Sequence, residues 1–271
     1  MKAFIRSGVL AVLLLCNLFA GGQELYVYTE PASNMPAKSV GLRLSYERMD
    51  DLDFSSRLVP EAMVGINRNL MVHAQAFLSD MEGPFAFEGA SFYAKYRFLS
   101  IDDLQKHFRM AAYGRISSSR RPFHSEDINL EGDNSGYQAG LVATQLLHKL
   151  ALSVTTGYAR VFKNDEKIRP HTAAPAGMLN YSLSAGYLLF PRVYRDYRQP
   201  NFNLYAEVLG KTNPGTGHSY LDIAPAVQLI LNSQLRIDVG YRFQATGNIE
   251  NRYLRNMFLA RVEYNIFNVI K

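Results

Sequence analysis

The sequence predicts an all-β protein: an antiparallel transmembrane β-barrel of about twelve strands, with short turns at one end and longer loops at the other. Three observations predict it. The 271-residue chain opens on an export signal, apolar and polar residues then alternate along most of its length, and no later stretch reads as a membrane helix. The alternation is clearest in residues 235–244. A strand sends alternate side chains to opposite faces, so this segment has one apolar and one polar face.

Residues 1–22 have the pattern of a cleaved signal peptide. Lys2 and Arg6 give a positive start, an apolar run follows, and small residues at 20–22 place the expected cleavage before Gln23. The apolar stretch is too short for a membrane anchor, because a spanning helix needs roughly 17 residues or more. The protein is therefore expected in the periplasm, in the outer membrane or outside the cell.

Composition limits the partners. The formal net charge is +5, but the basic residues are scattered and the chain is exported, so no nucleic-acid partner is expected. The single cysteine, Cys16, lies in the signal, and the mature chain is expected to hold no disulfide. A hydrophobic content of 48% suits a barrel as well as a soluble protein, because alternating strands average out.

Residues 23–37 carry two prolines among Ser, Asn and Thr, which predicts an extended lead-in outside the sheet. The barrel is predicted over 38–271, and its first strand over 40–47, where Val, Leu, Leu and Tyr alternate with Gly, Arg, Ser and Glu. The second strand, 61–66, follows a polar loop. An Asn-Arg-Asn turn then leads into the third, 70–78.

The next strands repeat the pattern. In residues 92–98, aromatic and Ala positions alternate with Tyr, Lys and Arg; residues 100–107 then form a polar connection, in which we expect a helical turn. Residues 108–116 form the fifth strand. The longest loop leads to the sixth, 137–144, and a Leu-His-Lys turn leads to the seventh, 150–158.

The last five strands alternate most regularly. Residues 179–189 place Leu, Tyr and Ala against Asn, Ser and Gly, and residues 202–211 follow an Arg- and Tyr-rich connection. An Asn-Ser-Gln turn joins 224–231 to 235–244, and 258–266 forms the twelfth strand. Pro225 is awkward in a closed barrel, which has no edge strand to hold it, so we expect a bulge there or a place near the strand end.

This layout resembles the outer-membrane β-barrel proteins of Gram-negative bacteria. The resemblance rests on the signal, on the alternation through residues 40–266 and on the C-terminal strand with Phe267 near its end. It implies location in the cell outer membrane, contact with outer-membrane lipid and with the barrel-assembly machinery, periplasmic short turns and extracellular longer loops. Aromatic residues near strand ends are expected to form the interfacial girdles; they are Tyr46, Tyr96, Phe98, Tyr158, Tyr187, Phe190, Phe243 and Tyr264.

The polar strand face carries more basic than acidic residues. The candidate lumen-facing residues are Arg43, Arg97, Arg109, Arg115, Arg236, Asp238, Arg242 and Arg261. Rings of Arg favour anions, which points to a porin-like or transporter barrel that passes or binds a small polar or anionic solute. The same residues also suit an internal salt-bridge network that fills a narrow barrel. Both interpretations stay open.

Two other functions are weighed. A structural or adhesive barrel would act through the loops at 117–135 and 162–173. A lipid hydrolase of the kind that resembles this layout needs a His-x-Ser pair on one strand face, but His73 has Gln75 two residues on, and the adjacent His124 and Ser125 would point apart. We therefore predict no catalytic residues and no enzyme. The histidines lack ligand spacing, so no metal or other cofactor is expected.

Overall fold

The computed structural model describes most of the chain after the predicted signal. The described residues are 25–49, 55–81, 83–103, 106–121, 126–162, 176–193, 196, 198–249, 252 and 254–269. The predicted signal and cleavage site, the loop at 163–173 and His124-Ser125 lie outside them. No helix among the described residues is long and apolar enough to cross a membrane.

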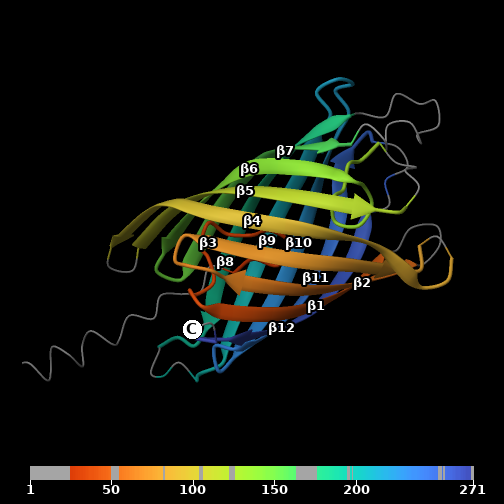
Figure 1. Ribbon diagram of the computed structural model, residues 1–271. Helices are drawn as coiled ribbons and strands as arrows, with labels where there is room; N and C mark the ends of the chain where they lie inside the picture. The colour runs from red at the N-terminus through yellow and green to blue at the C-terminus, as the bar shows by residue number, and fades with distance from the viewer. Residues whose placement is uncertain are drawn as a thin grey trace, which may run out of the picture.

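Within the described ranges, twelve antiparallel strands close into one barrel (Figure 1). Each strand pairs with its neighbours in sequence, and the last pairs with the first, which confirms the predicted fold class. The strands are β1 (Ser39–Met49), β2 (Ser55–Gly65), β3 (Leu70–Ser79), β4 (Ala86–Asp103), β5 (Lys106–Ser119), β6 (Gly136–Leu147), β7 (Leu150–Val161), β8 (Gly177–Phe190), β9 (Asn201–Thr212), β10 (Ser219–Leu231), β11 (Leu235–Gly247) and β12 (Asn256–Ile266).

The two faces of the wall are inverted relative to a soluble protein. Large apolar side chains stand exposed on the outside, among them Val154, Leu183 and Val262, while Arg236 and Asp238 are buried inside. A closed barrel pairs every strand edge, so such an apolar outer surface suits lipid. The exposed aromatic side chains include Tyr46, Tyr96, Phe98, Tyr158, Tyr187, Phe190 and Tyr264.

Two predicted boundaries were wrong. β2 begins at Ser55, inside the stretch predicted as a polar loop. β4 and β5 continue as a paired hairpin through the register Asp102↔His107, so the polar connection with a helical turn expected at 100–107 is absent from the described residues there. The end of β4 at 100–103 keeps its pairing but is exposed on both faces, so apolar alternation is lost there. At the start of β2 the pattern is polar because Arg57 is buried inside the barrel.

Pro225 sits in the middle of β10, not near its end. Its partner in β9 is Ala206. Toward β11 the described register passes from Ile223 to Ala226 without a partner for the proline. The same arrangement surrounds Pro60 in β2. Because proline has no N–H to donate, its place coincides with a gap in the pairing of β10 with β11. The nearest register shift in that pairing lies between Leu221 and Asp222.

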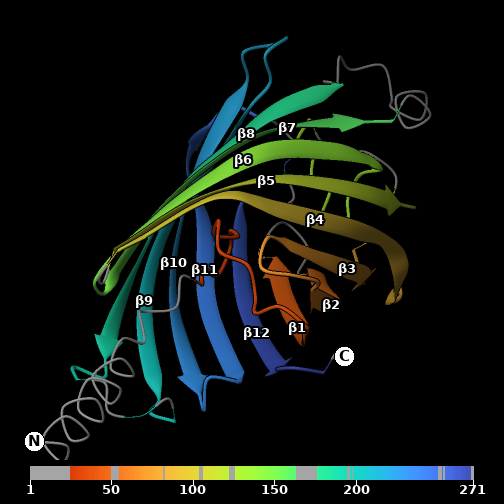
Figure 2. The same cartoon turned by 60° about the vertical axis from the view of Figure 1, so that its left-hand side comes forward.

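Two segments enter the barrel. The first, residues 25–37, is here named the plug segment; it runs through the lumen before β1 begins and is seen in red inside the barrel in Figure 2. The second, residues 126–135, is named the inward loop; it belongs to the β5–β6 connection, and its Ile128 and Leu130 are buried against Val161 and Met178.

Candidate functional site in the barrel lumen

The wall donates hydrogen bonds to the main-chain oxygens of the plug segment. Arg236 Nη2 donates to the carbonyl of Tyr26 over 2.7 Å, and Arg261 Nη1 donates to the carbonyl of Val27 over 2.6 Å. These two arginines come from the adjacent strands β11 and β12. One side of the lumen therefore holds the start of the segment through its backbone.

On β4, Lys95 holds the far half of the segment. Its Nζ donates to the carbonyls of Pro31 and Ser33 over 2.5 and 2.8 Å. From β5, Arg109 Nη1 donates to Ser33 Oγ over 2.8 Å. Lys95 is fully buried, so its charge is directed at the segment rather than at water.

The backbone donors of the segment are satisfied by acceptors from β9 and β6. Glu207 Oε1 accepts from the amides of Val27 and Tyr28 over 2.9 and 2.8 Å, and its Oε2 accepts from Thr29 Oγ1 over 2.6 Å. Ala32 N donates to Thr144 Oγ1 over 2.8 Å. Glu207 is fully buried, and its hydrogen-bond donors in the described part of the chain are uncharged groups.

Glu30 is the acidic side chain of the plug segment. Its carboxylate lies 3.3 Å from Arg43 Nη1 and 3.6 Å from Lys95 Nζ. Burial alone would raise the pKa of Glu30, but the charges of Lys95 and Arg43 outweigh it and lower that pKa to about 2. Glu30 is therefore ionised at neutral pH and bridges β1 and β4.

The inward loop is tied to the other half of the wall by its own acids. Asp127 Oδ1 lies 2.9 Å from Lys211 Nζ, and its Oδ2 accepts from Tyr220 Oη over 3.2 Å. Burial raises the pKa of Asp127, but Lys211 and Arg252 reverse the shift and hold the pKa below its ordinary value.

Asp133 and Glu131 anchor the centre of the inward loop. Asp133 bonds to both Arg57 and Arg121, and Glu131 lies 2.6 Å from Arg115 Nη1. In both carboxyls burial opposes ionisation, yet the neighbouring arginines lower the pKa below its ordinary value. The turn between them needs Gly132, whose φ is +110° and whose side-chain position would lie 2.9 Å from Arg57 Cζ.

A buried ion network forms the wall beneath the plug segment. Arg43 Nε lies 2.8 Å from Glu263, and Arg236 lies 2.7 Å from Asp238 and 3.4 Å from Glu263. Glu61 adds a second acid 3.1 Å from Arg43. Each charge is paired at close range, as burial away from water requires.

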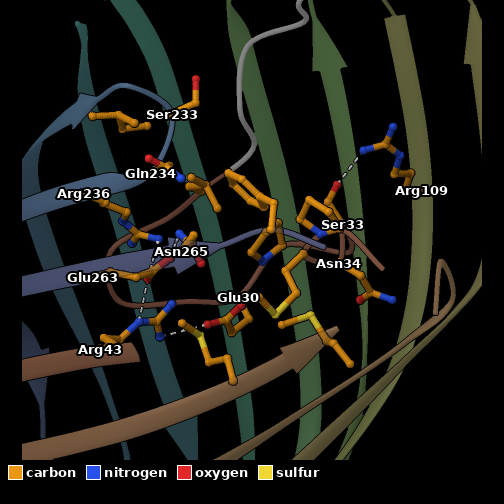
Figure 3. A pocket seen from close by; sticks show the side chains of 18 of the residues that line it. Glu30, Ser33, Asn34, Arg43, Arg109, Ser233, Gln234, Arg236, Glu263 and Asn265 are labelled. Carbon is orange, nitrogen blue, oxygen red and sulfur yellow. Dashed lines mark hydrogen bonds and ion pairs between the residues drawn. The ribbon is translucent and has the colours of Figure 1, made fainter. Parts of the chain in front are cut away.

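Three of the cavities inside the described barrel border the plug segment. One of about 350 Å³ opens at the end with the short turns, where Arg43, Glu263 and Arg236 converge on one side and Arg109 reaches Ser33 on the other (Figure 3). Two more, of about 80 and 180 Å³, are lined by both the plug segment and Glu131 of the inward loop. Glu30 lines all three, so the plug segment separates the outer cavities from the one at the short-turn end.

The eight candidate residues divide into three groups. Arg43, Arg109, Arg236 and Arg261 contact the plug segment, and Asp238 pairs with Arg236. Arg115 and Arg242 lie nearer the inward loop, where Arg115 meets Glu131 and Arg242 Nε lies 2.6 Å from Asp222. Arg97 stands apart and donates to the carbonyl of Arg68 in the β2–β3 turn over 2.8 Å.

Sequence reasoning missed the contributions of the two inserted segments. Glu30, Glu131 and Asp133 lie outside strands, where no alternation reports which way a side chain points. Lys95 and Glu207 share the polar face with the candidates, so strand parity could have included them. The acids of the inserted segments neutralise much of the basic excess that the strands alone present.

The histidines do not form a nucleophile-activating pair in the described chain. Nδ1 of His73 lies 2.6 Å from Glu61, but its Nε2, the atom that would take a proton from a nucleophile, has no hydrogen-bond partner. His107 and His218 bond to Asp102 and Glu126. No group of three or more His, Cys, Asp or Glu side chains in the described ranges is arranged to hold a metal ion.

Comparisons with known proteins find similarity only at the level of solved structures. No protein-family model matches the chain. No curated protein matches it either. The chain is similar to the KdgM porin, with 13% identity over 83% of this chain and 98% of that one and a TM-score of 0.49. It is also similar to outer membrane phospholipase A from Escherichia coli, at 10% identity, 94% and 98% coverage and a TM-score of 0.45. It is similar as well to Pseudomonas aeruginosa OprD, with 9% identity over 89% of this chain and 99% of that one and a TM-score of 0.39.

Proposed function

We propose that this protein is a porin-like channel of the outer membrane that passes a small polar or anionic solute, and that the plug segment closes it in this structure. The observation that carries the proposal is the position of Glu30, which lines the cavities on both sides of the segment. A polar path thus exists along the lumen, and one short segment interrupts it.

The attachment of the plug segment favours a removable closure. Side chains of the wall hold it, through hydrogen bonds to its main-chain atoms and through the ion pairs of Glu30. Each such bond yields only about 0.5–1.5 kcal/mol net, or about 1.5–3 with a charged group, because water competes for the same partners. A lumen that admits water therefore offers replacement partners when the segment leaves.

An open lumen would be more basic than the closed one. Arg236, Arg261 and Lys95 would exchange the segment's carbonyls for water, and Arg43 would lose one of its carboxylate partners. Such a row of basic groups favours anions and the oxygen atoms of polar solutes.

The alternatives find less support. An adhesive role through residues 117–135 conflicts with the inward loop, whose apolar and acidic residues are turned into the barrel. A lipid hydrolase needs a base in contact with a nucleophile, and His73 Nε2 lacks such a partner.

Planar-bilayer recording tests the proposal. Deletion of residues 25–36 is expected to raise conductance above that of the full-length protein, with a reversal potential that shows anion preference. Heat-modifiable migration on a gel checks that the deleted variant still forms a barrel. A folded variant that gives no channels would refute the channel, and cation preference would refute the basic path.

A further inference from the structure

We propose that the lumen is a recognition site for short peptides with free amino and carboxyl ends, and that the plug segment occupies it as a built-in peptide. The inference rests on the proposed function and names the solute class of the same site. It follows from which atoms of the segment the wall contacts, and from how acids and bases are distributed around them.

The wall contacts main-chain atoms of a segment that has no strand structure and bends at residues 27–29 and 32. Its donors reach the carbonyls of residues 26, 27, 31 and 33, and its acceptors take the amides of residues 27, 28 and 32. Such contacts depend little on side-chain identity, and main-chain hydrogen bonds are a recurring source of affinity in peptide recognition. The glycine at 65 adds to the fit, because a Cβ there would lie 2.1 Å from the carbonyl oxygen of Pro36.

Glu207 supplies the charge that a simple anion pore would lack. It is an acid on β9 with no ion-pair partner among the described residues, and of its four hydrogen-bond donors only Ser184 belongs to the wall. When the plug segment leaves, Glu207 keeps Ser184 and gains water as hydrogen-bond donors, and it presents its carboxyl group to the open lumen. A protonated amino group can form an ion pair with this carboxylate, whereas a chloride ion or a neutral sugar cannot.

The basic groups lie at a matching distance along the segment. Glu207 binds residues 27–29, whereas Arg43 and Lys95 bind the carboxylate of residue 30. One to three residue steps separate these points, and because the chain bends at residues 27–29 they span at most roughly 10 Å of chain. A tripeptide is therefore long enough to place its ammonium at Glu207 and its carboxylate at Arg43 and Lys95.

Liposome swelling with the variant that lacks residues 25–36 tests the inference. We expect trialanine to enter several-fold faster than its N-acetylated form and several-fold faster than a disaccharide of similar mass. Glu207→Gln in the same background is expected to abolish the preference for the free amino group without closing the channel. Asp196→Asn makes the same chemical change in the β8–β9 connection and is expected to keep the preference.

A binding readout that does not require transport completes the test. A synthetic peptide with the sequence of residues 25–36 is expected to block the deletion variant in planar bilayers, and to block its Glu207→Gln form less. Equal entry of free and acetylated trialanine, or equal block of both forms, would overturn the peptide site while leaving the channel intact. Absence of any conductance after deletion would instead count against the proposed function.

Discussion

Glu30 joins the plug segment to two strands that are not neighbours, β1 and β4. Because Arg43 and Lys95 lower its pKa to about 2, the carboxylate stays charged over the whole neutral and mildly acidic range. The charge of Glu30 stabilises the attachment of the plug segment fully at pH values above the ordinary pKa of about 4.5. This stabilisation is lost as the pH falls through the lowered pKa of about 2.

The first residue-scale prediction is a pH dependence of closure. Conductance of the full-length protein is expected to stay low from pH 7 to about 4.5 and to rise as the pH approaches 2, where Glu30 takes up a proton. Glu30→Gln removes the charge at every pH and is expected to raise conductance already at pH 7. Planar-bilayer recording over this range checks both. A Glu30→Gln variant that stays as closed as the wild type at pH 7 would show that this acid does not hold the segment.

Strand alternation separates inner from outer side chains, but it does not reveal which acid meets which base. Asp238 and Arg236 are two residues apart and share a face, so their contact of 2.7 Å follows from local spacing. Arg43 and Glu263 meet at 2.8 Å only because β1 closes against β12. Such a pairing depends on register across the whole barrel, which local sequence does not encode.

At the scale of elements, the inward loop is the second segment that packs inside the barrel. Its acids are matched to arginines from distant strands, notably Arg57 on β2 and Arg115 on β5. In the sequence this stretch is part of the longest loop, which we expected outside the barrel. Its polar residues instead pair with the polar interior of the barrel. Composition alone does not distinguish a polar loop in water from one that packs inside a polar lumen.

Removal of one central acid is expected to release the inward loop. Asp133→Asn removes the carboxylate that lies nearest to both Arg57 and Arg121, which keep Glu88 at 3.9 and 3.5 Å. Loss of one partner from a fully isolated buried pair costs about 3–5 kcal/mol, and the remaining carboxylate makes the cost here smaller. Limited proteolysis should then cut within residues 126–135 faster than in the wild type.

Glu126→Gln is the matched control in the same loop. Glu126 pairs with the partly exposed His218 over 2.8 Å, and pairs near the surface contribute about 0–1 kcal/mol. Its cleavage rate should stay near that of the wild type. If the protease cuts the loop of Asp133→Asn no faster than that of the wild type, other contacts hold the loop in place, such as the apolar packing of Ile128 and Leu130.

At the scale of the whole molecule, the sequence predicts the barrel, but it does not predict that the plug segment closes the lumen. Alternation with period two along each strand fixes an inside and an outside, and an apolar outside demands that all edges pair. The plug segment has no such period: its residues are held one at a time by side chains from β1, β4, β5, β6, β9, β11 and β12. The path of residues 25–37 through the lumen depends on all these strands at once, so no local pattern in the sequence reports it.

A reversible lock on the plug segment tests the central claim most directly. Thr29 Oγ1 and Ser184 Oγ lie 2.8 Å apart, so Thr29→Cys with Ser184→Cys places two thiols within reach of a disulfide. The chain's own cysteine, Cys16, lies in the predicted signal, and the two single-cysteine variants serve as controls. Oxidised double-cysteine protein in planar bilayers is expected to show no openings, and added reductant is expected to restore them, with no response in the controls. Openings that persist while the disulfide is intact would contradict closure of the lumen by the plug segment.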